Sequence, residues 1–278
     1  KGKKIAKERI YLGVDLEKKE LKEAEGKADK ELSGLNYLLT NNELAALDKI
    51  KEEFVKQPEA TNENRYEAFT SLFTYDSTAI EGNTLTLEET SSLLFENRVP
   101  KEKSLREINE TINHKKAFDY ILKYKGDITK RFICDLHRLV VENTLKPHLA
   151  DQIGKYRKVQ VFIRGVEWLP PAAKEIPREM KALLSWYTKN RNKLHPLIVA
   201  TYFHVGFETI HPFVDGNGRV GRLLMNFILH KKKYPMINIP NKIKSRYYEG
   251  LHKAQVDGDL RPLIKFLLDV YKDTKIMF

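Results

Sequence analysis

Apolar residues recur at helical spacing along almost the whole chain from Thr40 onward. A spacing of three or four residues between apolar positions is typical of helices that bury one face. Ser/Thr-x-x-Glu signals begin at Thr40, Thr86 and Ser104. They predict helix starts, because the hydroxyl and the carboxylate each accept a backbone N–H that the first turn leaves unpaired. The pattern therefore predicts a mainly α-helical fold.

Proline and glycine mark the ends of further predicted helices. One stripe of a predicted helix consists of Tyr66, Phe69, Phe73, Asp76 and Ile80. Gly82 follows it at a position where a helix C-terminal residue is expected. Pro177 and Pro196 stand near the start of two later helices, the second of which runs to about Ile210. The last helices are expected from Gly218 through Phe227, from about Lys242 to Gln255, and from Leu260 to Tyr271.

Two segments depart from this helical pattern. Tyr156 to Leu169 alternates in part, has Arg164-Gly165 in its middle and ends at Pro170-Pro171. It predicts a single β-hairpin. Residues 1–36 are rich in lysine and glutamate, and we expect a solvated helix or linker there, after a run at Arg9 to Leu12 that could be the end of a strand.

Composition restricts the class of protein. The chain has 278 residues, 41% hydrophobic and 31% charged, which is enough for one sizeable core and excludes a disordered chain. The single Cys134 excludes an internal disulfide and any zinc ribbon or iron–sulfur cluster built from this chain alone. No apolar run reaches the length of a membrane span and no secretory signal is visible, so we expect a cytoplasmic protein without a membrane partner. The sequence begins at Lys1, which leaves open whether a segment was removed before it.

The charge balance indicates the kind of partner. Lys and Arg number 49 against 38 Asp and Glu, so the formal net charge is +11. Such a surplus favours anionic partners, which include nucleotides, nucleic acid and acidic protein surfaces. The charge does not choose among them.

One stretch carries most of the chemistry, and it reads His211-Pro212-Phe213-Val214-Asp215-Gly216-Asn217-Gly218-Arg219-Val220-Gly221-Arg222. Gly216 and Gly218 let backbone N–H groups approach an anion at the positive end of a helix. Arg219 and Arg222 lie three residues apart, on one helical face, and can reach the same polyphosphate. His211 is a proton acceptor near neutral pH, and a carboxylate such as Asp215 is a hard ligand for Mg²⁺.

Other nucleotide and metal motifs do not fit. Gly216-x-Gly218-x-x-Gly221 matches the dinucleotide fingerprint, but that motif needs a strand before it and an acidic residue about 20 positions later. The preceding segment is predicted to be helical, and no Asp or Glu occurs between Asp215 and Glu249. The P-loop pattern and the His-Glu-x-x-His zinc signature are absent from the sequence.

The stretch from His211 to Arg222 resembles the Fic-domain motif, His-Pro-Phe-x-Asp-Gly-Asn-Gly-Arg-x-x-Arg, at every specified position. The resemblance covers roughly Thr61 to Leu268. It implies a Fic fold, a helical bundle with one β-hairpin flap, in which residues 61–278 form the Fic domain. The inhibitory helix would lie at about 62–82 and the core at about 104–268, with residues 1–60 as an N-terminal helical or linker extension.

The same resemblance implies a protein adenylyltransferase, which moves AMP from ATP to a Ser, Thr or Tyr hydroxyl of a target protein or of itself. His211 would be the general base, and Asp215 would hold Mg²⁺ or Mn²⁺. The stretch from Gly216 to Arg222 would bind nucleotide: Gly216, Asn217 and Gly218 as the anion hole, Arg219 and Arg222 on phosphates, with Val220 and Gly221 between them. Phe213 would anchor the loop.

Two further groups of residues take roles from the resemblance. Tyr247, Tyr248 and Gln255 would contact the nucleoside, although Gln255 replaces the more usual Asn and the two tyrosines could be ordinary packing. The flap tip, Ile163, Arg164, Gly165 and Val166, would border the nucleotide site and align the target chain by strand addition. Homodimers are common in the family, but nothing in the sequence fixes one.

Ser77-Thr78-Ala79-Ile80-Glu81-Gly82 resembles the inhibitory pattern of the family, Ser/Thr-x-x-x-Glu-Gly/Asn. A Glu81 carboxylate paired with Arg222 would occupy donors that the γ-phosphate needs. The plain alternative is that Glu81 ends a helix and has no regulatory role. A second functional alternative is removal of AMP from a modified target, with Glu81 positioning a water.

A different class of function also stays open. In that interpretation the charge of +11 would serve nucleic acid, and the Fic core would be regulatory or inert. Because the lysines are spread along the chain and no nucleic-acid motif is recognisable, nucleic acid is the less favoured partner. The sequence does not identify the target protein, and it does not exclude transfer of a group other than AMP.

Overall fold

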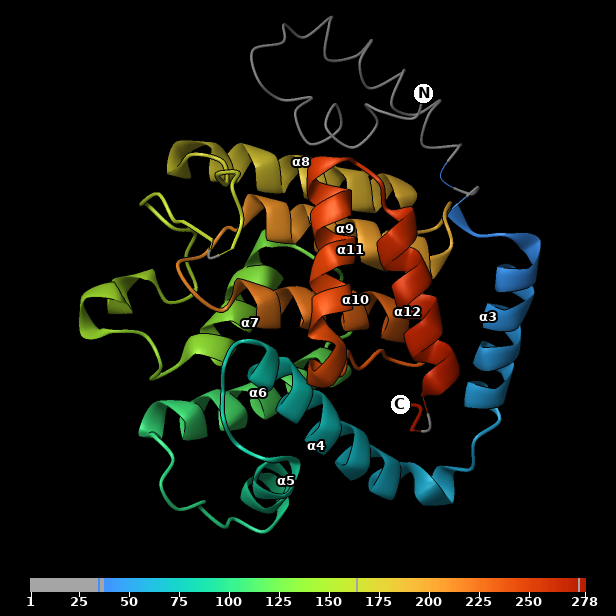
Figure 1. Ribbon diagram of the computed structural model, residues 1–278, viewed down its shortest axis with the longest axis horizontal. Helices are drawn as coiled ribbons and strands as arrows, with labels where there is room; N and C mark the ends of the chain where they lie inside the picture. The colour runs from blue at the N-terminus through green and yellow to red at the C-terminus, as the bar shows by residue number, and fades with distance from the viewer. Residues whose placement is uncertain (1–34, 36–37, 164, 275) are drawn as a thin grey trace, which may run out of the picture.

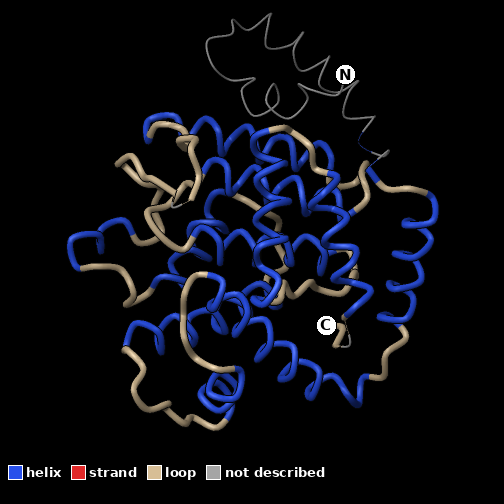
Figure 2. The backbone as a smooth tube through the Cα atoms, viewed as in Figure 1, coloured by secondary structure: helices blue, strands red, loops and turns tan. Residues whose placement is uncertain are grey.

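The computed structural model describes residues 35, 38–163, 165–274 and 276–278. Helices account for nearly all of its regular structure, which confirms the mainly α prediction (Figures 1 and 2). The predicted strand end at Arg9 to Leu12 and the helix or linker up to residue 34 lie outside the described residues. The α-helices are α3 (Asn41–Val55), α4 (Asn62–Ile80), α5 (Leu87–Phe95), α6 (Leu105–Lys123), α7 (Lys130–Val141), α8 (Ile176–Asn190), α9 (Pro196–Ile210), α10 (Asn217–Lys231), α11 (Lys244–Val256) and α12 (Arg261–Asp273).

Helix starts follow the predicted chemistry. Thr40, Thr86 and Ser104 each form a complete capping box, at the start of α3, α5 and α6. A cap of this kind contributes roughly 0.5–2 kcal/mol. Pro196 is the first residue of α9 and Pro177 the second residue of α8, so neither ring removes a helical hydrogen bond.

The core is built around α9 and α10. Nearly every residue of α9 is buried, and α10 is buried over most of its length. A helix that is apolar on all sides belongs at the centre of a domain. α10 packs against α9, α6, α7 and α4, and Figure 1 shows it crossing the middle of the molecule with α11 across it.

Helix α4 carries the predicted stripe into this core. Phe69, Phe73 and Ile80 are buried, and the last turn ends at Glu81 followed by Gly82 with φ of 101°. The buried Asp76 carboxylate accepts hydrogen bonds from Asn238 Nδ2 and from the backbone N–H of Asn241. These bonds fix the C-terminal half of α4 against the loop before α11.

The predicted β-hairpin is not found. Between residues 156 and 169 no strand occurs among the described residues. The arms of the loop are held by side chains instead: Arg157 donates to the backbone oxygens of Val159 and Pro171, and Gln160 donates to that of Pro170. Pro170 and Pro171 have no N–H to give to a ladder, so they cannot extend strand pairing at the base of the loop.

No helix of the described residues is both long enough and apolar enough to cross a membrane.

Candidate active site

The candidate base lies at a strained turn after α9. His211 has φ of 49° and ψ of 61°, a left-handed conformation that costs a non-glycine residue about 1–2 kcal/mol. Arg157 holds this turn from the outside. Its Nε donates to the backbone oxygen of His211 at 2.8 Å, and its backbone N–H donates to that of Pro212 at 2.9 Å. The strain is therefore maintained by a buried arginine that the motif does not contain.

Phe213 anchors the loop that follows. Its side chain is fully buried, and its ring stacks on His137 at 3.8 Å between centroids. The Asn217 side chain accepts the N–H of Phe213 and donates to its carbonyl, both at 2.9 Å. Burying a phenylalanine contributes about 1.5–3 kcal/mol, so this packing stabilises the observed conformation of the loop.

His137 fixes the next residue of the loop. The Gly154 N–H donates to His137 Nδ1 at 3.0 Å, so the ring proton resides on Nε2 and is donated to the Asp215 backbone oxygen at 3.2 Å. Burial lowers the pKa of His137 to about 4, which keeps the ring neutral. We therefore interpret His137 as a positioning residue for the Asp215 backbone.

The His211 imidazole is itself neutral near pH 7. Burial lowers its pKa to about 4, and 21% of its side chain stays exposed. Its Nδ1 lies 3.9 Å from Glu208 Oε2. A neutral imidazole with partial access can accept a proton from a hydroxyl group.

The start of α10 forms an anion cradle, which we define as the backbone around Gly216 to Gly218 together with Arg219 and Arg222. Gly216 has φ of 80°, and its N–H donates to Asp215 Oδ1. The helix that begins at Asn217 has no side-chain cap on its first N–H groups. Arg219 and Arg222 are 2% and 1% exposed. Two buried guanidiniums beside an uncapped helix start favour a bound anion.

Glu81 places its own carboxylate in this cradle. Arg222 Nη2 donates to Glu81 Oε1 at 2.7 Å and to the backbone oxygen of Ser77 at 2.8 Å, while Nε donates to Ser77 Oγ at 3.0 Å. A Cβ at Gly218 would lie only 2.2 Å from Glu81 Oε1. Burial opposes the charge of Arg222, but the charge and hydrogen bond of Glu81, together with Tyr247 and Glu208, raise the Arg222 pKa overall. The end of α4 thus supplies the anion that the cradle attracts.

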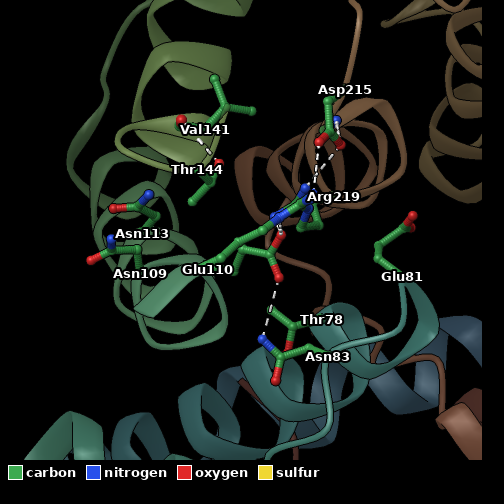
Figure 3. Close-up of polar contacts among 12 residues, drawn as sticks. Thr78, Glu81, Asn83, Asn109, Glu110, Asn113, Val141, Thr144, Asp215 and Arg219 are labelled. Atoms are coloured by element: carbon green, nitrogen blue, oxygen red, sulfur yellow. Dashed lines mark hydrogen bonds and ion pairs between the residues drawn. The ribbon is translucent and has the colours of Figure 1, made fainter. Parts of the chain in front are cut away.

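A second set of charges closes into a ring beside the cradle. Asp215 Oδ1 accepts from Arg219 Nη2 at 3.2 Å, and its Oδ2 accepts from Arg106 Nη2 at 3.0 Å. Glu110 Oε1 lies 3.0 Å from Arg106 Nε and 3.5 Å from Arg219 Nη1. Figure 3 shows Glu110 of α6 and Asp215 on opposite sides of Arg219. We call these four residues the charge ring.

The donors around Asp215 fit a metal held mainly by a ligand's phosphates. Among the described residues no group of three or more His, Cys, Asp or Glu could hold a metal ion by itself. The Asp215 side chain is 33% exposed and offers hard carboxylate oxygens. Mg²⁺ commonly takes one or two carboxylates and completes its shell with water and substrate phosphates.

Comparison with known proteins identifies this core. Residues 127–229 match the profile of the Fic/DOC family. Over 206 residues the chain is 37% identical to a protein named "Protein adenylyltransferase Fic" from Drosophila persimilis, with 72% of this chain covered. The chain contains a Fic/DOC domain. It spans 39% of the length of that Fic relative and 47% of a namesake from Drosophila mojavensis, to which it is 36% identical over 85% of its own length.

Solved Fic structures share the fold. A Fic domain containing signaling protein from Bacteroides thetaiotaomicron has a TM-score of 0.73 at 27% identity and covers 82% of this chain, which in turn covers 93% of that protein. Fic-1 from C. elegans, residues 134–508, has a TM-score of 0.74 at 26% identity, with 97% of this chain and 79% of that chain covered. The Fic fold therefore extends well beyond the 103 residues of the profile match.

Of the residues expected to contact the nucleoside, Tyr247 and Tyr248 interact electrostatically with Arg222 and Glu81. Tyr247 is 2% exposed, and its hydroxyl lies 2.7 Å from Nε2 of the buried His204. Tyr248 is 43% exposed on the same helix, and Gln255, its second-last residue, is half-buried. Of the predicted flap tip, Ile163 and Val166 are partly buried, Gly165 is exposed with φ of 81°, and Arg164 lies outside the described residues.

The structure adds residues that the Fic motif does not mark. They are Arg106, Glu110, His137, Arg157 and Glu208. Most of their partners are 54 to 109 positions away in the sequence, and several are backbone oxygens that no side-chain pattern reveals. Only Glu208, three residues before His211, has a local signal that could have been noticed.

Proposed function

We propose that this protein is a protein adenylyltransferase, which transfers AMP from ATP to a hydroxyl of a target protein or of itself. The observation that carries the proposal is the convergence of the neutral His211, the Asp215 carboxylate and the anion cradle at one helix start. The curated relatives, which are named protein adenylyltransferases, support the same assignment. Because the chain spans less than half of those proteins, the activity is argued from its own site.

The chemistry is an in-line displacement at the α-phosphorus. The hydroxyl oxygen of the target forms a bond to that phosphorus while the bond to the bridging oxygen of pyrophosphate breaks. His211 takes the hydroxyl proton, and pyrophosphate leaves with the electron pair. A positioned general base contributes on the order of 10²–10⁴-fold. The N–H groups of the cradle and Arg219 would stabilise the charge on the phosphate oxygens.

Asp215 would hold Mg²⁺ or Mn²⁺ when the nucleotide binds. The metal supplies neutralisation of charge on the α- and β-phosphates. Arg222 would bind the γ-phosphate, which favours a triphosphate over a monophosphate donor. Residues 61–278 are the proposed Fic unit, with α4 as its inhibitory helix.

Glu81 restrains the reaction in this proposal. Its carboxylate pairs with Arg222 at 2.7 Å, which denies that guanidinium to the γ-phosphate. ATP would then bind with its α-phosphorus displaced from the line of attack. Because near-attack geometry governs the rate, a displacement of about 1 Å can cost on the order of 10²-fold.

Replacing the carboxylate tests both the activity and the restraint. We expect Glu81→Gly to raise self-modification from labelled ATP by on the order of 10²-fold over wild type. Glu81→Gly with His211→Ala is the matched control, because it frees the cradle and removes the base. Mass spectrometry after incubation with each nucleotide identifies the transferred group. Equal labelling of wild type and Glu81→Gly would contradict the restraint, and labelling by the double variant would contradict the role of His211.

Removal of AMP from a modified target is the second candidate activity. One observation favours it: Glu81 is 34% exposed and so keeps access to water while it lies over the cradle. In this role the carboxylate would position a water for attack on the phosphodiester. Release of AMP by wild type but not by Glu81→Gly would support this reaction.

The target would dock on the loop around Ile163 to Val166. Support comes from apolar side chains in its arms, since Phe162 is 79% and Leu169 60% exposed. A target backbone could add to this loop as an extra strand. A homodimer remains a separate proposal that draws on the family alone.

A further inference from the structure

The charge ring joins two cations of very different solvent exposure to one carboxylate. Arg219 is 2% exposed, whereas 53% of the Arg106 side chain is exposed. Arg106 reaches Asp215 from α6, 109 positions earlier in the sequence. The Arg106 guanidinium can leave Asp215 and move into solvent. The Arg219 guanidinium is buried, so separating it from Asp215 would leave a buried charge without this partner.

Both oxygens of the Asp215 carboxylate are already used. Oδ1 accepts from Arg219 and from the Gly216 N–H, and Oδ2 accepts from Arg106. A Mg²⁺ ion binds carboxylate oxygen at about 2.0–2.1 Å. A guanidinium 3.0 Å from the same oxygen would then lie within a few ångströms of a divalent cation, and like charges at that distance repel strongly.

Glu110 can keep Arg106 bound if a metal ion displaces that guanidinium from Asp215. Its carboxylate is 9% exposed, contacts both arginines, and accepts from Asn83 Nδ2 at 3.4 Å. If Arg106 leaves Asp215, its Nε can keep the bond to Glu110. Arg219 also keeps its contact with Glu110, so the buried part of the ring survives the exchange.

We infer that Arg106 is a displaceable counter-ion of Asp215 that competes with the divalent metal of the bound nucleotide. This inference rests on the proposed function, since it needs a metal–nucleoside triphosphate at the cradle. Without metal, Arg106 holds the Asp215 side chain in place and offsets its charge beside Glu110. When the metal binds, Arg106 leaves Asp215. Because the metal must displace Arg106, it increases the affinity for nucleotide less than it would at a free carboxylate. Arg106 is thus a positioning residue that sets the metal requirement.

Nucleotide binding with and without metal measures this competition directly. The parent is Glu81→Gly, in which the cradle holds no carboxylate. Calorimetry with a nonhydrolysable ATP analogue gives Kd in EDTA and in Mg²⁺, and the ratio of the two is the metal enhancement. We expect Arg106→Gln to increase this ratio about two- to fivefold, the range for one partly exposed ion pair. Arg131→Gln is the matched control, since it removes the same charge from a side chain that is 92% exposed and forms an ion pair with Asp135.

A double-mutant cycle separates competition from a general effect on the fold. Asp215→Asn removes the shared carboxylate, so adding Arg106→Gln to it should leave the metal enhancement unchanged. An unchanged ratio for Arg106→Gln alone would overturn the inference. A lower ratio would also overturn it, by making Arg106 a ligand of the phosphates. Failure of the parent to bind the analogue under either condition would instead refute the proposed function.

Discussion

At the scale of single residues, Glu208 is the most unusual group beside the candidate base. Its side chain is only 9% exposed, and no described residue donates a hydrogen bond to its Oε1. A Cβ at Gly221 would lie 2.3 Å from that oxygen, so the glycine makes room for it. Burial raises the pKa of Glu208 to about 8, although Arg222 works in the opposite direction. A neutral carboxylic acid therefore faces His211 at pH 7.

This raised pKa predicts a pH dependence of stability. An acid whose pKa is higher in the folded state stabilises the fold fully below its unfolded pKa near 4.5, and the contribution is lost as pH rises toward about 8. His211 and His137, with pKa lowered to about 4, change stability only below about pH 6.5. Between pH 6.5 and 8 we expect wild type to lose up to about 1.4 kcal/mol per pH unit relative to Glu208→Gln.

Urea unfolding at half-unit steps of pH checks this difference. Glu208→Gln keeps the shape of the side chain and cannot ionise, so its stability should change less over the range. Glu67→Gln, at an exposed position of α4, is the matched control and should run parallel to wild type. Parallel curves for wild type and Glu208→Gln would mean that Glu208 is already ionised in the fold.

The sequence motif identifies some residues of the site and does not identify others. The residues from His211 to Arg222 were found because each carries its chemistry at a fixed spacing. Arg157 and His137 were missed because they act through backbone oxygens of His211 and Asp215. Which arginine or histidine meets a given carbonyl depends on helix packing, and no local pattern records it.

At the scale of elements, the sequence predicts helix starts correctly but not the conformation of residues 156–169. Capping boxes act within four residues, so Thr40, Thr86 and Ser104 fix their helix starts locally. The alternation at Val159 to Ile163 predicts strands only if a partner arm can donate hydrogen bonds. Pro170 and Pro171 remove donors only at the base of the loop, where Arg157 takes the carbonyl of Val159. The predicted hairpin failed because pairing is not a local property.

The end of α4 carries a prediction at this scale. Gly82 has φ of 101°, and a Cβ there would meet no atom within 4 Å. Gly82→Ala therefore introduces backbone strain without a clash, about 1 kcal/mol or somewhat more. Fraying of the last turn relieves that strain and carries Glu81 away from Arg222. We expect labelling from ATP above wild type but below Glu81→Gly, together with a lower free energy of unfolding.

A second glycine controls for lost stability. Gly258 has φ of 72° in the turn between α11 and α12, so Gly258→Ala imposes a similar backbone cost elsewhere. It should lower the midpoint of urea unfolding without raising label incorporation. If the two alanine variants label equally, the position of the α4 end does not control the cradle.

At the scale of the whole molecule, the net charge of +11 and the cradle point to different ligands. A spread surplus of lysine attracts any polyanion, and that attraction weakens steeply with salt. The cradle instead has two buried arginines at one helix start, where solvent ions screen much less. A ligand bound by the cradle should therefore stabilise the fold at physiological salt, and a ligand bound by surface charge should not.

Thermal unfolding in 150 mM KCl compares the two ligands in the Glu81→Gly protein. A ligand present at 100 times its Kd adds about 2.7 kcal/mol, which corresponds to roughly 5–10 °C in a chain of this size. We expect Mg²⁺-ATP to produce that shift and duplex DNA at equal phosphate concentration to produce little, because binding through several phosphates weakens by on the order of 10³-fold between 50 and 200 mM salt. Wild type is the matched control: Glu81 already fills the cradle, so its shift with Mg²⁺-ATP should be smaller. Stabilisation by DNA alone, retained at this salt, would favour a nucleic-acid-binding module in which the Fic core is inert.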